Sequence, residues 1–356
     1  MKRRILYWRA NGITRAKATT CGRPRTHTVR PYVYIMQMLS LASIIIFAAI
    51  CILLITGCSS QQNKTKQNKS MTTMRIAAIL PDDRGYWERV QSGFNSGAEG
   101  LDVDIKVSYS YPYFDIPQMT ELIKAATAAR VDAIIIQGTN DADYLNALKA
   151  ASEKGILIAF VDADIAGFSQ RLYVGTDNYS AGWFMAEKLI EMADGRTDVA
   201  VLMGGEGFLN LDSRLDGFRD GIAEDDNIRL LAVEQTNFDA VTIIEKYYGI
   251  VEENPTVNAI VCLDGTGGAA FGGALGPSDT SSLKILCFDM LTVTETAIKN
   301  GIIDGTIIQD PIEMGEKAIQ ELYKCFVGQQ SLPVVAYTDI SFITADDLED
   351  TTDEDR

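Results

Sequence analysis

From Met74 onward, short β-branched runs alternate with amphipathic stretches, and this pattern constrains the fold of the chain more than any other feature. The runs are apolar almost throughout, as in parallel strands covered on both faces, and the stretches between them have helical periodicity. One series ends near Val161, and a second of the same kind begins at Leu172. The order predicts an α/β fold with parallel sheets.

The length of the patterned region indicates two lobes. Roughly 275 residues separate a polar run, Ser59–Thr73, from an acidic end, which is more than one hydrophobic core usually serves. Ligands of such sheets bind beyond the carboxyl ends of the strands. The residues that follow each predicted strand are therefore the candidates for a site.

The first part of the chain has the order of a lipoprotein export signal. Residues 1–35 hold nine Lys or Arg and no acid, an uncharged apolar stretch runs from Leu39 to Gly57, and Cys58 follows. Small residues before a cysteine suit cleavage ahead of a lipid-modified thiol. We predict a signal peptide over 1–57, lipidation at Cys58, a linker over 58–73 and attachment to the outer side of the cell membrane.

The alternative is an uncleaved transmembrane anchor, because the apolar stretch is just long enough to span a bilayer. In both readings the folded part faces the extracellular or periplasmic side. The pattern does not distinguish a Gram-positive from a Gram-negative envelope. It also leaves open whether residues 1–35 are translated, since Met36 and Met38 offer later starts.

Charge excludes several functions. All 48 acidic residues lie after Cys58 with 23 of the 32 basic ones, which gives the mature chain a net charge of −25 and disfavours a nucleic-acid partner. The only histidine, His27, lies in the leader, so a Ser-His-Asp site or a histidine-containing zinc site is excluded. No metal and no cofactor are expected.

The mature cysteines other than Cys58 are Cys262, Cys287 and Cys325. Their number is odd and their spacing matches no metal motif. Cys262 and Cys287 both end predicted buried strands, which favours small buried side chains over a disulfide.

Four elements occur in an order that closely resembles the periplasmic sugar-binding proteins of the ribose- and galactose-binding type. They are Tyr86-Trp87, Arg214-x-x-Gly217-Phe218, Phe288-Asp289 and Gly305-Thr306-x-x-Gln309. The resemblance covers Met74 to about Thr344. It implies the type I periplasmic-binding-protein fold, in which two Rossmann-like lobes joined by a three-strand hinge close on a small ligand.

The resemblance also implies domain boundaries. We place the crossings near Asp164, Gln309 and Tyr337. Lobe one would comprise 74–164 plus 310–337, and lobe two 165–309 plus 338–345. An acidic tail, 346–356, would fray.

By the same resemblance, Tyr86, Trp87 and Phe238 would clamp the apolar faces of a sugar ring. The alternative for the adjacent pair at a helix start is a place in the core. Arg84 stands where the ribose-binding pattern has asparagine, and so does Asp264. These departures suggest a different sugar or a charged ligand.

The polar candidates have implied roles and alternatives. Arg214 would donate a fork of hydrogen bonds, Asp289 and Asn140 would bind hydroxyl groups, and Gln309 would contact both ligand and hinge. Asp289 and Asp264 can also serve as helix caps, and Arg214 as a surface charge. Asp162 and Asp164 line the cleft or occupy a solvated turn.

The implied function is that of a monomeric protein that captures a sugar or polyol and delivers it to the permease of an ABC transporter. The alternative is a ligand-sensing subunit for a membrane receptor or histidine kinase, which sequence alone does not separate from transport. The segment Gly265–Ala270 fits a dinucleotide fingerprint, but it lies in the middle of the second series instead of its first βαβ unit. The chain is therefore not expected to be an enzyme.

Overall fold

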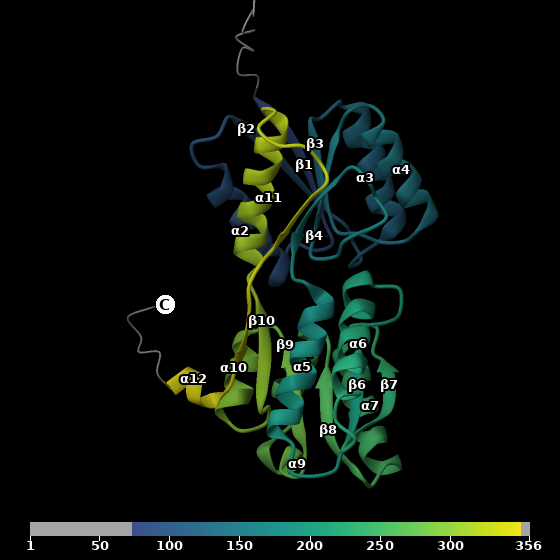
Figure 1. The fold of residues 1–356 in the computed structure, drawn as a ribbon, viewed down its shortest axis with the longest axis vertical. Helices are drawn as coiled ribbons and strands as arrows, with labels where there is room; N and C mark the ends of the chain where they lie inside the picture. Colours follow the sequence, from purple (N-terminus) through teal and green to yellow (C-terminus); the bar gives the residue numbers. More distant parts are fainter. Residues whose placement is uncertain (1–72, 350–356) are drawn as a thin grey trace, which may run out of the picture. The chain divides into compact units, whose positions relative to one another are not determined.

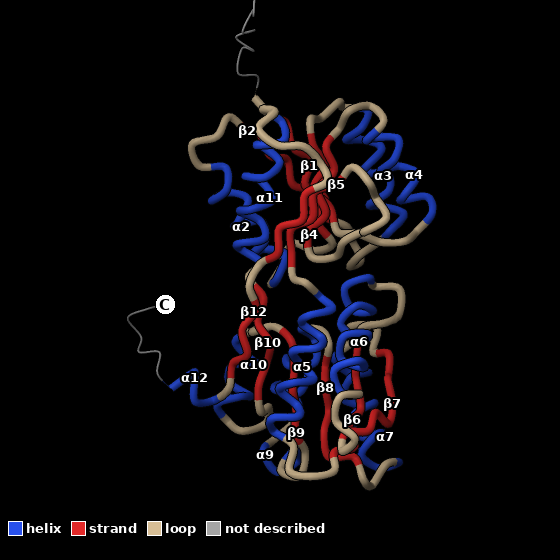
Figure 2. The backbone as a smooth tube through the Cα atoms, viewed as in Figure 1, coloured by secondary structure: helices blue, strands red, loops and turns tan. Residues whose placement is uncertain are grey.

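The computed structural model describes residues 73–349, which form two six-stranded sheets with helices on their faces (Figure 1, Figure 2). The first sheet has the order β11-β5-β4-β3-β1-β2. Its strands, all parallel to their neighbours, are β1 (Met74–Leu80), β2 (Val103–Tyr109), β3 (Ala133–Ile136), β4 (Leu157–Val161), β5 (Arg171–Gly175) and β11 (Val334–Tyr337).

The second sheet has the order β12-β10-β9-β8-β6-β7. Its strands are β6 (Thr197–Met203), β7 (Ile228–Gln235), β8 (Val257–Cys262), β9 (Lys284–Phe288), β10 (Gly305–Gln309) and β12 (Ile340–Ile343). All pairs are parallel except β10 with β12. The predicted α/β class with two lobes is confirmed.

Aspartate caps mark the starts of many of the helices between these strands. The helices are α2 (Tyr86–Ala98), α3 (Ile116–Ala128), α4 (Ala142–Ser152), α5 (Asn178–Met192), α6 (Leu209–Ile222), α7 (Ala240–Glu253), α8 (Gly265–Ala274), α9 (Pro277–Thr280), α10 (Thr292–Lys299), α11 (Pro311–Phe326) and α12 (Ala345–Glu349). Asp115, Asp141, Asp177, Asp239, Asp264 and Asp310 each accept a backbone N–H of the helix they precede. Such caps satisfy donors that a helix start leaves free.

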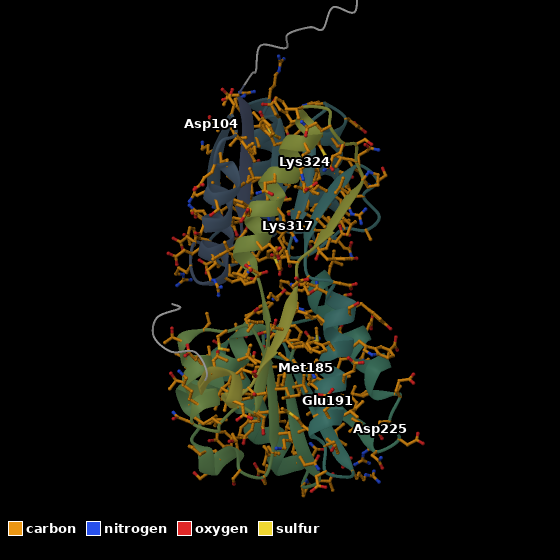
Figure 3. The ribbon with its side chains drawn as sticks, turned by 60° about the vertical axis from the view of Figure 1, so that its left-hand side comes forward. Asp104, Met185, Glu191, Asp225, Lys317 and Lys324 are labelled. Atoms are coloured by element: carbon orange, nitrogen blue, oxygen red, sulfur yellow. The ribbon has the colours of Figure 1, made fainter. Side chains whose placement is uncertain are left out.

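Both faces of each sheet are buried, as the near-continuous apolar strands predict. One face of the first sheet packs with α2 and α11, and the other packs with α3 and α4. Polar residues stay on the outside of the helices: Met185 of α5 is buried, whereas Glu191 of the same helix is exposed and pairs with Lys188 at 2.7 Å (Figure 3).

The expected first crossing near Asp164 is wrong. Strand β5 pairs in parallel with β4 in the first sheet, for example Phe160 with Tyr173, so the chain leaves that sheet only after Gly175. The connection between β4 and β5 contains no helix. Parallel neighbours usually need a longer, helical crossover. The sequence pattern therefore predicted that the strand near Leu172 belongs to the second series, with lobe two beginning at residue 165. We propose lobe one as 74–175 plus 310–337.

The end of the described chain is more ordered than expected. Residues 346–349 belong to α12, where Asp347 accepts the Thr344 N–H at 2.8 Å and Leu348 packs against the second core. The prediction that fraying starts at residue 346 is wrong for this turn. Residues 350–356 lie outside the described residues, as do the predicted leader, the linker and Cys58.

Packing explains two other sequence features. Cys262, Cys287 and Cys325 are free thiols, the first two buried at the ends of neighbouring strands, which confirms the preference against a disulfide. The fingerprint-like glycines begin α8, and a Cβ at Gly268 would lie 2.7 Å from the Thr294 side chain. Close helix packing therefore accounts for a glycine there. Among residues 73–349 no helix is long and apolar enough to cross a membrane.

Candidate functional site

The carboxyl ends of strands from both sheets meet at one set of polar side chains, most of which are buried. Its centre is Arg214 of α6, which is 2% exposed. We define the polar cluster as the following residues: Gln137, Asp162, Thr176, Asn178, Asn210, Arg214, Asp264, Asp289 and Gln309. Most of its members follow strands, as expected for a ligand site of α/β sheets.

Arg214 uses its whole guanidinium group. Its Nε donates to Asn178 Oδ1 at 2.8 Å, one terminal nitrogen donates to the Leu263 carbonyl at 3.0 Å and the other to Gln309 Oε1 at 2.8 Å. The planar group also lies 4.3 Å from the centre of the Phe288 ring. Stacking and fixed hydrogen bonds hold the guanidinium rigidly, so the alternative of a surface charge is wrong.

Gln309 links Arg214 to the strand ends around it. Its Oε1 accepts from Thr176 Oγ1 at 2.8 Å as well as from Arg214, and its Nε2 donates to Asp289 Oδ1 at 2.9 Å. Thr176 directly follows β5 of the first sheet, whereas Gln309 ends β10 of the second. The predicted residues Arg214, Asp289 and Gln309 are thus brought together.

Asp162 forms hydrogen bonds with residues of both halves of the molecule. Its carboxylate accepts from Tyr86 Oη at 3.1 Å, from Gln137 Nε2 at 2.6 Å and from Asn210 Nδ2 at 2.8 Å. Asn210 belongs to α6, on the second sheet. Of the two alternatives left open for Asp162, the solvated turn is wrong, because the residue is 4% exposed.

Burial raises the pKa of the three carboxyl groups of the cluster. For Asp162 burial acts first, Arg214 opposes it and Asp289 adds to it, and the pKa rises to about 6. Burial likewise raises the pKa of Asp264 and of Asp289, again against the attraction of Arg214. The ionised form is disfavoured because the interior solvates charge poorly.

Aromatic side chains from both sheets lie beside the cluster. Phe238 stacks edge-on against Phe208, with ring centres 4.8 Å apart, and its ring centre is 5.5 Å from that of Tyr113. Tyr113 precedes α3 of the first sheet and was not predicted. A Cβ at Gly204 would lie 2.1 Å from the Phe238 ring, so only glycine fits there. We call Tyr113, Phe114, Phe208 and Phe238 the aromatic cluster.

The two adjacent aromatics differ in their surroundings. Tyr86 reaches Asp162, whereas Trp87 is 3% exposed and belongs to the core of the first sheet, the alternative that sequence left open. The Trp87 ring meets Tyr86 edge-on at 5.3 Å, and its N–H donates to Tyr113. Trp87 thus positions two aromatics beside the cleft.

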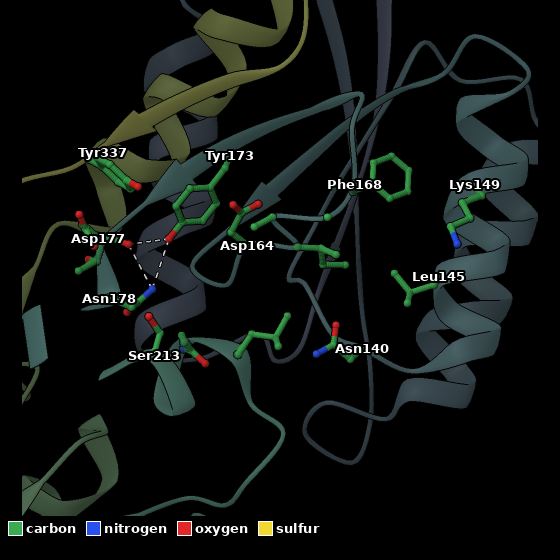
Figure 4. Close-up of a pocket in the computed structure, with 16 residues that line it drawn as sticks. Asn140, Leu145, Lys149, Asp164, Phe168, Tyr173, Asp177, Asn178, Ser213 and Tyr337 are labelled. Atoms are coloured by element: carbon green, nitrogen blue, oxygen red, sulfur yellow. Dashed lines mark hydrogen bonds between the residues drawn. The ribbon is translucent and has the colours of Figure 1, made fainter. Parts of the chain in front are cut away.

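Arg84 and Asn140 do not join the polar cluster. The Arg84 side chain is 79% exposed and pairs with Asp82 at 3.0 Å. It lies before α2, where no wall of the cleft covers it. Asn140 is exposed and lines an open cavity of about 600 Å³ (Figure 4).

That cavity adjoins the cluster. Asp164, Tyr173 and Tyr337 line it, whereas Arg214, Asp264 and Asp289 do not. Thr176, Asn178 and Asn210 belong to both, and Tyr173 Oη donates to the Thr176 carbonyl at 2.7 Å (Figure 4). These side chains form a wall between the open cavity and the buried cluster.

Sequence reasoning missed Gln137, Thr176, Asn178 and Asn210. Gln137 and Thr176 directly follow β3 and β5, at the carboxyl ends where ligand-binding residues are expected, so exact strand ends would have been needed to find them. Asn178 and Asn210 lie in the first turns of α5 and α6, where the pattern of apolar residues gives no signal.

A two-lobed α/β fold with a polar and aromatic site between its sheets defines a ligand-binding protein. A family model described as the periplasmic binding protein domain matches residues 76–330, and the chain belongs to this family. The resemblance seen in the sequence is therefore confirmed, as is the prediction of a binding protein and not an enzyme.

Individual relatives agree with this membership. The solved structure of a glucose-galactose binding protein from Geobacillus stearothermophilus is 30% identical, with a TM-score of 0.73 over 78% of this chain and 99% of the other. A solute-binding protein of an ABC transporter from Burkholderia graminis, solved with D-arabinose, is 25% identical, with a TM-score of 0.72 over 79% and 99% of the two chains. The D-apiose import binding protein of Actinobacillus succinogenes is 22% identical over 253 residues, 70% of this chain and 81% of the relative.

Proposed function

We propose that this protein is a lipid-anchored, extracytoplasmic solute-binding protein that captures a sugar or polyol between its lobes for an ABC transporter. The observation that carries the proposal is the polar cluster, whose hydrogen bonds join strand ends of both sheets through Asp162, Asn210 and Gln309. The relatives described above, which bind or import sugars by name, support it.

The chemistry of the site suits a polyhydroxylated ring. Carboxylates such as Asp289 accept hydroxyl protons, and the Arg214 guanidinium donates to oxygens. Phe238 of the aromatic cluster would pack against the C–H face of the ring. A ligand that lacks one hydroxyl group would leave a buried partner unpaired, which gives selectivity.

Closure of the lobes is the proposed response to the ligand. Asp162 and Asn210 meet only when the two sheets approach, and a ligand that bridges the same side chains would shift the population toward that form. The permease would then recognise the closed form through surfaces on both lobes.

The membrane anchor is proposed at Cys58. A thioether-linked diacylglycerol there would hold the folded part outside the membrane on the polar linker 58–73. Intact-mass spectrometry tests this: the wild type should begin at Cys58 and carry the mass of a diacylglyceryl group, whereas Cys58→Ala should carry no lipid and keep the leader.

A thermal-shift screen of the purified full-length protein against sugars, polyols and amino acids tests the binding function. At least one sugar should raise the melting temperature in a concentration-dependent way, because it binds only the folded state. Asp289→Ala should abolish that shift. Its matched control, Asp216→Ala, removes a carboxylate that is 69% exposed on α6 and should respond like the wild type. A full response from Asp289→Ala would show that the site is misplaced.

A further inference from the structure

The polar cluster holds more negative than positive charge. Asp162, Asp264 and Asp289 contribute three carboxyl groups, whereas Arg214 is the one buried cation among residues 73–349. These four groups act on one another electrostatically: Arg214 and Asp289 shift the pKa of Asp162, and Arg214 and Asp264 shift that of Asp289. With all three carboxyl groups ionised, the centre carries two uncompensated negative charges.

Arg214 does not pair directly with any of these carboxylates. Its three donating nitrogens are occupied by neutral acceptors, namely the side chains of Asn178 and Gln309 and the carbonyl of Leu263. Within the part of the chain that the structure describes, no Lys or Arg nitrogen lies within 4.0 Å of Asp162, Asp264 or Asp289. A buried carboxylate without a close cation is costly unless something else compensates it.

One buried acceptor of the polar cluster has no donor. Gln137 is 2% exposed, and while its Nε2 donates to Asp162 at 2.6 Å, its Oε1 is buried without a hydrogen-bond partner. Asp289 receives one hydrogen bond from Gln309, on Oδ1. The buried Gln137 oxygen without a donor indicates a group that has yet to bind.

A bound ammonium group would compensate the negative charge and would also supply hydrogen-bond donors to the acceptors. It carries three donors, no acceptor and one positive charge, whereas a hydroxyl group has a single donor and no charge. A hydroxyl would also add an acceptor to a site where the Gln137 oxygen already lacks a donor.

We propose that the ligand is an amino sugar, with its protonated amino group seated among Asp162, Asp264 and Asp289. This inference rests on the proposed sugar-binding function and names the ligand class of that site. The raised pKa values of these carboxyl groups agree with it, since a bound cation would lower them.

Isothermal titration calorimetry of the full-length protein at pH 7 tests the inference. Glucosamine, galactosamine and mannosamine are compared with glucose, galactose and mannose. At least one amino sugar should bind tenfold or more tightly than its neutral parent.

A conservative variant tests whether the Asp289 carboxylate recognises the positive charge of the ligand. Asp289→Asn keeps a residue type that tolerates the positive φ of 64° and retains an acceptor for Gln309, but it removes one negative charge. The preference for the amino sugar should fall about tenfold. The control, Asp216→Asn, removes the same charge from an exposed position and should keep the preference.

The outcomes separate this inference from the proposed function. Neutral parents that bind as tightly as the amino sugars, or a preference unchanged in Asp289→Asn, would overturn the inference while sugar binding stands. If no sugar of either set binds, and none appears in the wider thermal-shift screen, both proposals fail.

Discussion

The chemistry of the site depends on a few side chains whose roles differ from what their residue types suggest. Arg214 is a buried centre of hydrogen bonds instead of a surface charge, and Asp162 is a buried link between sheets instead of a solvated turn. Asp162 could be singled out only as a residue after a strand. Nothing in the sequence fixes its partners, because Tyr86, Gln137 and Asn210 come from distant segments.

The raised pKa of Asp162 predicts a pH dependence of stability. The folded state holds a proton up to about pH 6, whereas the ordinary pKa is 3.8, so between these values folding takes up a proton. The free energy of unfolding should therefore fall as pH rises from about 4 to about 6, by up to about 3 kcal/mol from this group. Asp162→Asn should reduce the slope, as measured by chemical denaturation of the apo protein at pH 4, 5 and 6. Equal slopes in both proteins would contradict the assignment.

At the scale of elements, the sequence predicted best where periodicity and length agree. The apolar run that ends the first series near Val161 forms strand β4 (Leu157–Val161), as expected. Helix α8 begins at Gly265, inside the segment that fits a dinucleotide fingerprint, because Asp264 caps it and its glycines allow close packing. Intrinsic propensity disfavours glycine in a helix, so only tertiary contact explains this start.

The cap of α8 gives a second prediction, which separates stability from ligand recognition. Asp264 accepts the Thr266 N–H at 2.9 Å, and serine can do the same at this position. Asp264→Ser should be about 1 kcal/mol more stable than Asp264→Ala in denaturant unfolding. Both should lose ligand affinity, since both lack the carboxylate. If Asp264→Ser still binds the ligand tightly, Asp264 acts only as a helix cap and does not recognise the ligand.

At the scale of the whole molecule, the two halves are connected through the contact between Asp162 and Asn210 and through the three chain crossings. The sequence predicted two lobes from length and repetition. It misplaced one crossing because β5 joins the first sheet through a connection without a helix.

Charge repulsion across the lobes should open the protein. In Asn210→Asp a carboxylate would face Asp162 at the position where the amide now donates at 2.8 Å. The radius of gyration in small-angle X-ray scattering should increase, and ligand affinity should fall, because like charges at this distance repel. Asn95→Asp, at an exposed position on α2, adds the same charge and should leave both unchanged. An unaltered scattering profile of Asn210→Asp would argue against closure through this contact.

The sequence by itself determined the α/β class, the two lobes, the excluded chemistries and the family, since apolar periodicity, residue counts and motif order are local properties of the chain. Only the tertiary structure decided which polar side chains share a site. Arg84 and Arg214 are both arginines near predicted helix starts, yet one is exposed and the other is buried among strand ends. Hydrogen-bond partners and burial arise from contacts between distant segments, and those contacts exist only once the sheets and helices have packed.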